Sequence, residues 1–148
     1  MTEHKYIKDI DKLECDCFPD ENFNSTDALA FRWVHSDFNN PNNFLPVFKI
    51  DPNRVEDYEN CNQKCMGYGL SLDSNLSKAE KKITTYLKRK PQLVKVFGDS
   101  IAEGKLEKDD GTANRPDSKS HFTFHEHKNC NLKTKFATIK QIKLWKTH

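Results

Sequence analysis

The clearest helical pattern in the sequence covers residues 77–90. Ser77-Lys78-Ala79-Glu80 has the form of a capping box, in which the serine hydroxyl and the glutamate carboxylate satisfy free backbone N–H groups of the first helical turn. The apolar side chains that follow are spaced to form one buried stripe: Ala79, Ile83, Tyr86 and Leu87. Basic residues then precede Pro91, which stops a helix. The sequence therefore predicts one main helix.

The remaining apolar segments are of strand length. The alternation in 28–35 places Leu29, Phe31 and Trp33 on one face and Arg32 on the other. The predicted strands are 28–35, 66–72, 93–97, 101–106, 121–127 and 136–145. The last one also fits a helical spacing, but its Thr and Ile residues favour a strand. One helix among about six mostly antiparallel strands predicts a single α+β domain.

Two segments look irregular. Residues 36–65 contain three prolines and several asparagines between apolar anchors, so we expect a long irregular loop there. Residues 1–27 carry eight acidic side chains and little periodicity, which indicates an acidic N-terminal arm ahead of one α+β domain over 28–148. At the other end, residues 128–148 carry six lysines and no acid. The formal net charge of +2 hides this gradient.

Several classes of protein are disfavoured. No apolar run approaches the length of a membrane span, and the N-terminus lacks the apolar stretch of a signal peptide, so we expect no membrane partner and a cytoplasmic location. The chain has five cysteines in 148 residues, an odd number that argues against a disulfide framework and favours reduced thiols. Its five glycines form neither of the standard phosphate-binding loops.

Residues 120–130 concentrate three of the six histidines. In a strand, His121, Thr123, His125 and His127 share one face, whereas Phe122, Phe124 and Glu126 share the other. The phenylalanines should point to the core, which leaves a histidine face that is either solvated or lines a site. Zinc could bind there with Cys61 and Cys65 or with Cys130, but the CxxxC spacing is looser than usual, so we assign no metal site.

The order of three residues along the predicted elements is informative. Arg32 lies in the middle of the first strand, Ser71 lies near the end of the second, and Glu126 lies in a later strand. This order loosely resembles that of ADP-ribosyltransferase-like domains, in which an Arg, a Ser-Thr-Ser strand and a Glu surround nicotinamide adenine dinucleotide (NAD). The resemblance spans about residues 28–142. The Ser-Thr-Ser pattern is replaced here by Leu70-Ser71-Leu72.

The resemblance implies a role for each of these residues. Arg32 would hold the pyrophosphate, Ser71 would contact the nicotinamide ribose, and Glu126 would be the catalytic acid. Tyr68, between two glycines, would be a further NAD contact. If the site opens on the histidine face instead, His121 or His125 would replace the acid. Small domains of this class often act as toxins or effectors in bacterial conflict, and the resemblance implies such a role for this chain.

A second hypothesis belongs to a different class. The chain could be a non-catalytic module that docks a protein partner or an acidic surface through its lysine-rich C-terminal strand and the 36–65 loop. A third hypothesis, with less support, is nucleic-acid binding, in which Phe38, Phe44 or Trp145 would stack on bases beside lysines. Binding of NAD, of a protein or of nucleic acid can be distinguished by experiment.

Overall fold

The computed structural model describes residues 3–18 and 20–143. Seven antiparallel strands form one open sheet in the order β1-β5-β6-β3-β2-β4-β7. The strands are β1 (Asn24–Ser25), β2 (Ala28–Val34), β3 (Leu70–Asp73), β4 (Ser100–Leu106), β5 (Gly111–Ala113), β6 (His121–Glu126) and β7 (Phe136–Gln141). The prediction of an α+β domain with mostly antiparallel strands is confirmed.

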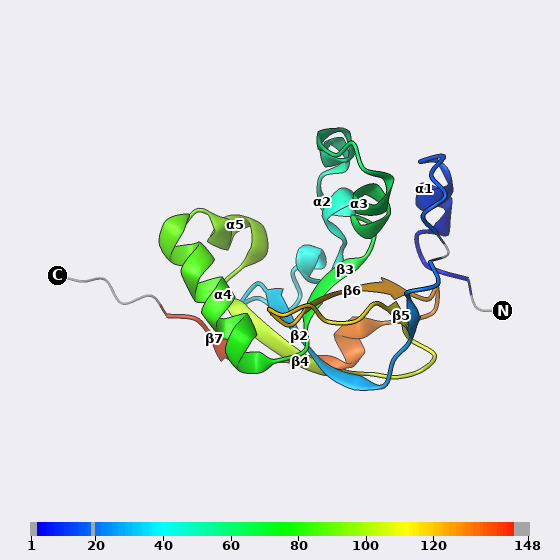
Figure 1. The fold of residues 1–148 in the computed structure, drawn as a ribbon. Coiled ribbons are helices and arrows are strands. Elements are labelled where there is room, and N and C mark those ends of the chain that lie inside the picture. Colours follow the sequence, from blue (N-terminus) through cyan, green and yellow to red (C-terminus); the bar gives the residue numbers. More distant parts are fainter. Residues whose placement is uncertain (1–2, 19, 144–148) are drawn as a thin grey trace.

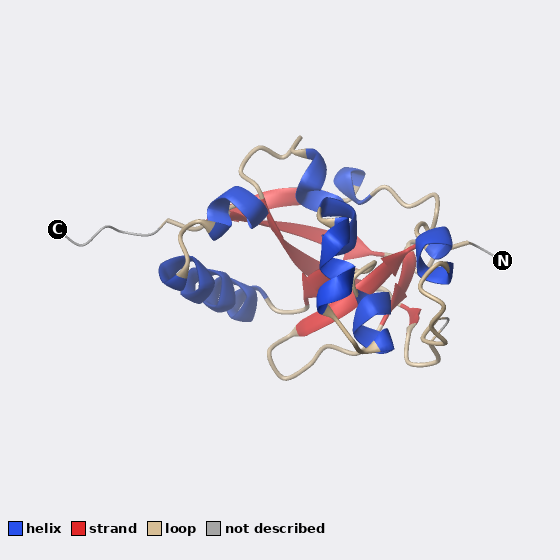
Figure 2. Cartoon of the chain, turned by 90° about the horizontal axis from the view of Figure 1, so that it is seen from above, coloured by secondary structure: helices blue, strands red, loops and turns tan. Residues whose placement is uncertain are grey.

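Five α-helices occur among the described residues: α1 (Ile7–Asp11), α2 (Val47–Ile50), α3 (Cys61–Met66), α4 (Leu76–Arg89) and α5 (Leu93–Phe97). Seen from above, helices lie in front of the strands (Figure 2). α2 and α3 stand together over the middle of the sheet, α4 and α5 lie together at one side, and α1 lies at the other (Figure 1). The helical content is therefore spread over several elements, and the prediction of one main helix with an otherwise β-rich chain was too simple.

The longest helix, α4, begins at Leu76, one residue before the predicted start. Its N-cap is Asn75, whose side-chain oxygen accepts a hydrogen bond from the backbone N–H of Lys78 at 3.0 Å. Asparagine is as effective an N-cap as serine. Ser77 lies inside the first turn, so the capping-box assignment was wrong. Tyr86, which we expected in the buried stripe, is 47% exposed.

The predicted strand 93–97 is the helix α5. The backbone N–H of Gly98 donates to the carbonyl of Val94 at 2.8 Å, which closes a helical turn. Gly98 has a φ of 87°, the left-handed conformation that glycine adopts most readily at a helix end. A five-residue apolar run fits a strand or a helix equally well by periodicity, which explains the error.

The 36–65 segment is not irregular throughout. It contains α2, most of α3 and two 3-10 helices, Pro41–Phe44 and Pro52–Asp57. Met66 ends α3, so β3 starts at Leu70, later than predicted. The ring of Phe48 lies against Gly67, where a Cβ atom would come within 2.1 Å of it. The close approach that this glycine allows is therefore used by a side chain of the protein itself.

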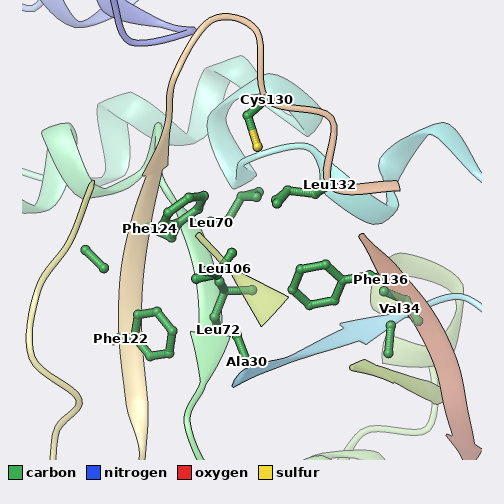
Figure 3. Close-up of a cluster of buried hydrophobic side chains, with 12 residues drawn as sticks. Ala30, Val34, Leu70, Leu72, Leu106, Phe122, Phe124, Cys130, Leu132 and Phe136 are labelled. Atoms are coloured by element: carbon green, nitrogen blue, oxygen red, sulfur yellow. The ribbon is translucent and has the colours of Figure 1, made fainter. Parts of the chain in front are cut away.

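The main hydrophobic cluster lies on the face of the sheet away from α4. It contains twelve buried side chains, among them Leu70, Phe124 and Phe136 (Figure 3). Phe38 and Phe44 pack against this cluster and are partly buried. Trp145, the third aromatic residue of that hypothesis, lies outside the described residues.

The second cluster joins α4 to the opposite face of the sheet. Ala79, Ile83 and Leu87 pack there with Phe31 and Ile101. Alternate residues of β2 consequently point to different clusters, as the alternation in 28–35 predicts.

Two disulfides tie the N-terminal arm to α3. Cys15 is bonded to Cys61, and Cys17 is bonded to Cys65. Cys130 is the one free cysteine among the described residues and is buried. The expectation of reduced thiols was therefore wrong for four of the five cysteines. Disulfides persist in oxidising compartments, whereas the sequence led us to expect a cytoplasmic location. The location of the protein stays a prediction.

The arm also adds to the sheet. β1 pairs with β5, and His4 forms an isolated bridge with His127 beyond the end of β6. The backbone N–H of Lys5 donates to the carbonyl of Glu126 at 2.8 Å. Residues 3–5 thus lie beside the end of β6, where hydrogen bonds hold them, and the disulfides hold residues 15–17 against α3.

Candidate ligand-binding cleft

An open cleft of about 730 Å³ lies over β2, β3 and β6. Residues of α2 and α3 form one wall, and residues of α4 and α5 form the other. Figure 1 shows these two helical pairs apart from each other, with α2 and α3 over the middle of the sheet and α4 and α5 at one side. The volume is within the range of about 300–1,000 Å³ that small-molecule sites occupy.

The floor of the cleft carries polar side chains on alternate strand positions. Ser71 is exposed there although it lies on β3, an interior strand of the sheet. Thr123 is opposite Ser71 across the β3–β6 ladder, and His121 is opposite Asp73. These side chains share one face because residues two apart along a strand point the same way. The neighbours Leu70 and Leu72 belong to the main hydrophobic cluster on the other face.

Asp73 and Lys82 form an ion pair at the edge of this floor. The ammonium group of Lys82, on α4, contacts Oδ1 of Asp73, and the hydroxyl of Ser120 donates to the same oxygen at 3.0 Å. Both charged side chains are largely buried. Burial and the nearby Lys82 charge lower the pKa of His121. The cleft therefore presents a neutral imidazole, a hydroxyl and a compensated ion pair at pH 7.

The wall on the α4 side is aromatic. The rings of Trp33 and Tyr86 are nearly parallel, with centroids 6.2 Å apart and 13° between their planes. Trp33 also contacts Phe97, at 5.1 Å between centroids, and its indole N–H donates to the carbonyl of Gly98 at 2.7 Å. That hydrogen bond fixes the orientation of the indole. Because Tyr86 is 47% exposed, its ring offers an accessible flat surface beside the fixed Trp33.

Arg32 is fully engaged with backbone carbonyls. Its guanidinium donates to the carbonyls of Asn43 at 2.7 Å, Ser71 at 2.9 Å and Leu45 at 3.2 Å. Desolvation by burial lowers the pKa of Arg32 to about 10, and the charge of Glu126 opposes that shift. Arg32 therefore links β2 to β3 and to the loop around Asn43.

Glu126 lies on the face opposite Ser71. It has the same strand parity as Phe122 and Phe124, which belong to the main cluster, whereas Ser71 is paired with Thr123. The Glu126 carboxylate accepts a hydrogen bond from Nζ of Lys5 at 2.6 Å through Oε2. Burial raises the pKa of Glu126, and Lys5 and Arg32 oppose that rise. The structure thus brings Arg32 into electrostatic range of Glu126, and it separates Glu126 from the Ser71 hydroxyl.

The other predicted residues have different surroundings. His121 lines the cleft, as does Ser71. Tyr68 packs edge-on against Phe48, with ring centroids 5.3 Å apart, and is not among the residues that line the cleft. His125 is buried under the arm, with ring centroids 4.9 Å from Phe18 and 5.1 Å from Phe23. The face of β6 that carries the histidines is therefore divided between the cleft and the arm.

The histidines do not form a metal site in the part of the chain that is described. His4, His125 and His127 lie near one another, with ring centroids of 4.7 Å for His4 and His127 and 6.4 Å for His4 and His125. No group of three or more His, Cys, Asp or Glu side chains in the described ranges is arranged to hold an ion. His4 instead contacts the hydroxyl of Thr112 at 3.1 Å.

Sequence reasoning missed four residues of the cleft: Trp33, Asp73, Lys82 and Tyr86. Strand alternation assigned Trp33 to a face, but nothing in the sequence indicated that this face is only partly covered. The Asp73–Lys82 pair spans nine residues and two elements, so local spacing does not predict it.

Comparison of the chain with known protein families, with curated proteins and with solved structures found no match. Within the described residues, no helix has the length and apolar character that crossing a bilayer requires.

Proposed function

We propose that the protein binds a small molecule in the cleft over β2, β3 and β6, and that the ligand combines a flat aromatic group with a polar or anionic part. The observation that carries this proposal is the exposed Ser71 hydroxyl on an interior strand, at the floor of a cleft of about 730 Å³ with an aromatic wall. Clefts with apolar walls and a few convergent polar groups are the usual form of small-molecule sites.

The two sides of the cleft suit different parts of a ligand. Trp33 and Tyr86 would contact a planar ring, since aromatic surfaces favour stacking. Ser71 and His121 offer hydrogen bonds, and Lys119 and Arg54 add positive charge around the opening. A nucleotide has this combination of a flat base, hydroxyl groups and phosphates. NAD, which the resemblance of the sequence implies, is therefore the first ligand to test.

The proposal is limited to binding and assigns no reaction. Glu126, the acid that the resemblance implies, lies on the other face of the sheet. The carboxylate on the cleft floor is Asp73, which already accepts from Lys82 and Ser120. Transfer of ADP-ribose would require an acid beside the ribose. Activity assays of Asp73 and His121 variants would test whether either side chain has that role.

Thermal unfolding with NAD, ADP-ribose and AMP tests the proposal. A ligand at a hundred times its dissociation constant stabilises the folded state by about 2.7 kcal/mol, which raises the melting temperature by several degrees. Ser71→Tyr should abolish the shift because the ring would occupy the cleft floor. Thr138→Tyr, at an exposed position of β7, is the matched control and should keep it. No shift with any of the three ligands at millimolar concentration would contradict the proposal, as would an unchanged shift in Ser71→Tyr.

A second candidate function is docking of an acidic protein partner along β7. This strand lies at the edge of the sheet, and all its residues except Phe136 are exposed. Edge strands present free backbone groups to which another strand can pair. Lys135 and Lys140 are already paired with acidic side chains of the protein, so the charge available to a partner is reduced.

Binding of labelled polyglutamate and of single-stranded DNA at two salt concentrations separates this candidate from nucleic-acid binding. Docking of an acidic protein predicts binding of polyglutamate that Lys133→Glu weakens. Nucleic-acid binding predicts affinity for the DNA that falls steeply with salt. If neither polymer binds at low salt, both of these candidates are rejected.

A further inference from the structure

A second pocket, of about 380 Å³, lies on the other side of the sheet from the cleft. Three segments that are distant in the sequence form it: the arm at Lys5 and Tyr6, the loop 38–45, and the connection 131–133 between β6 and β7. Glu126 lines this pocket where β6 ends. Of the residues that line this pocket, Leu45 is the one that also lines the cleft described above.

One oxygen of Glu126 has no hydrogen-bond partner. Oε2 accepts from Nζ of Lys5 at 2.6 Å, but Oε1 is buried and has no donor. It is the one buried side-chain nitrogen or oxygen atom in this condition among the described residues. The residue as a whole is only 4% exposed. Buried polar atoms are nearly always paired, so an unpaired one at the wall of a pocket indicates a missing donor.

The missing partner is a donor of a hydrogen bond and not a positive charge. Lys5 already neutralises the carboxylate, and its ammonium also donates to the carbonyl of Cys130 at 2.8 Å. Burial raises the pKa of this carboxylate, and the charge of Arg32 opposes that rise. A further cation would be repelled by Lys5, which occupies the other oxygen. A neutral N–H or O–H group would complete the carboxylate without this repulsion.

The rest of the pocket wall combines apolar and aromatic residues with three asparagines and two lysines. Tyr6, Phe38 and Phe44 contribute aromatic rings, and Leu45 and Leu132 contribute aliphatic side chains. The rings of Phe38 and Phe44 are nearly perpendicular, with centroids 5.8 Å apart. Such a wall favours a ligand with an aromatic or aliphatic body.

We propose that this pocket binds a small neutral molecule that has an apolar, ring-containing body and one N–H or O–H group that donates to Oε1 of Glu126. The site is independent of the cleft and does not rest on the proposed function. Its specificity comes from the free carboxylate oxygen, and its affinity comes from the apolar residues of the wall.

Indole and 1-methylindole provide a direct test, because they differ in the N–H donor and have similar bodies. Binding to the full chain is followed by amide chemical shifts in two-dimensional NMR spectra. Indole should shift the resonances of residues around Glu126, Leu132 and Phe44, and 1-methylindole should bind about tenfold more weakly, as expected for the loss of one hydrogen bond to a charged group.

A blocking variant makes the test independent of Glu126 itself. Asn39 lines the pocket and is exposed, so Asn39→Trp should fill the pocket without unfolding the protein, and it should abolish the shifts caused by indole. Asn53→Trp, at an exposed position outside both cavities, should bind indole normally. Equal affinities for the two compounds would overturn the proposal. So would the absence of binding at millimolar indole, or binding retained in Asn39→Trp.

Discussion

Lys5 and Glu126, which are 121 residues apart in the sequence, form an ion pair of 2.6 Å that joins the arm to the end of β6. The Glu126 side chain is 2% exposed and that of Lys5 is 28% exposed. Nζ of Lys5 also donates to the carbonyl of Cys130. The ammonium group of Lys5 thus donates to two acceptors, and these contacts attach the arm to the end of β6.

Lys5→Met should lower the free energy of unfolding by about 3 kcal/mol, because it leaves the Glu126 carboxylate buried without its compensating charge. Burial raises the pKa of Glu126, so this group favours folding below its unfolded pKa of about 4.3 and opposes folding once the pH exceeds its folded pKa. Lys5→Met raises that pKa further. The deficit relative to the wild type should therefore be larger at pH 7 than at pH 4.

Urea unfolding at the two pH values measures this deficit. Lys8→Met is the matched control, since Lys8 is exposed on α1, and should change the free energy by less than about 0.5 kcal/mol. A Lys5→Met deficit of the same size at pH 4 and pH 7 would contradict the role assigned to the pair.

The stability of the wild type should rise between pH 4 and pH 6.5 because of His125. Burial, followed by the charge of His4, lowers the pKa of His125 to about 4. The unfolded chain binds a proton with a pKa of about 6.5, whereas the folded chain keeps the ring neutral. Stability from this group is therefore complete above pH 6.5, and about 3 kcal/mol of it is lost as the pH falls to 4.

His125→Leu should flatten this dependence, because leucine cannot take up a proton in the unfolded state. His4, whose pKa is lowered by burial and by His127, leaves a smaller slope. Urea unfolding at half-unit pH steps gives both curves, and an NMR titration of the ring reports the pKa directly. Curves of equal slope would show that His125 does not titrate as its burial implies.

The parts of the fold that depend on local pattern could be predicted from the sequence. The alternation in 28–35 correctly divides β2 between two hydrophobic clusters, and the stripe of α4 is correct at Ala79, Ile83 and Leu87. Phe122 and Phe124 point to the core as strand alternation predicts. These features are set by neighbours within one element, and so they are visible in the sequence.

The parts that depend on distant contacts could not be predicted. Whether Cys15 meets Cys61 depends on where the arm lies, and an odd cysteine count does not exclude two pairs and one free thiol. Arg32 could be assigned to a face of β2, but its three carbonyl partners come from segments whose positions only the fold determines. The separation of Ser71 from Glu126 likewise depends on the register between β3 and β6.

Loss of both disulfides should cost more than the sum of the two single losses. The bonded cysteines are 46 and 48 residues apart. Closing a loop of that length contributes about 4 kcal/mol, whereas a second bond beside the first closes a loop of only about eight residues and contributes about 2.5 kcal/mol. Each pairwise Cys→Ser variant keeps one long loop closed and should lose about 2.5 kcal/mol, and the variant without either bond should lose about 6.5 kcal/mol.

Urea unfolding of the oxidised variants Cys15→Ser/Cys61→Ser and Cys17→Ser/Cys65→Ser, and of the fourfold variant, measures these losses. A fourfold loss equal to the sum of the two pairwise losses would show that the two bonds close independent loops. Mass spectrometry of the digested wild type checks that the pairing is Cys15 with Cys61.

Thiol titration should find no reactive cysteine in the native protein and one in denaturant without reductant. Cys130 is the one free cysteine in the described residues, and burial followed by the charge of Glu126 raises its pKa to about 12. The thiolate is the reactive form, so a buried thiol with a raised pKa reacts very slowly. Rapid labelling of one thiol in the native state would contradict the burial of Cys130, and labelling of five in denaturant would contradict the disulfides.

Arg32→Ala should destabilise the protein in the absence of any ligand by about 3 kcal/mol, because it leaves the carbonyls of Asn43, Leu45 and Ser71 without their charged donor. Arg32→Lys should recover part of the loss, since an ammonium cannot reach three divergent carbonyls as a planar guanidinium does. Arg89→Ala, at the exposed end of α4, is the control and should be nearly neutral.

The variant Arg32→Ala also separates two possible roles of this residue. If its guanidinium holds the loop around Asn43, urea unfolding without NAD already shows the full loss, and the ligand-induced shift in melting temperature is weakened only through the changed cleft. If Arg32 instead holds an anionic ligand, Arg32→Ala leaves the free energy of unfolding near the wild-type value and abolishes the shift. The three hydrogen bonds to carbonyls favour the first result. An unchanged free energy of unfolding would contradict it.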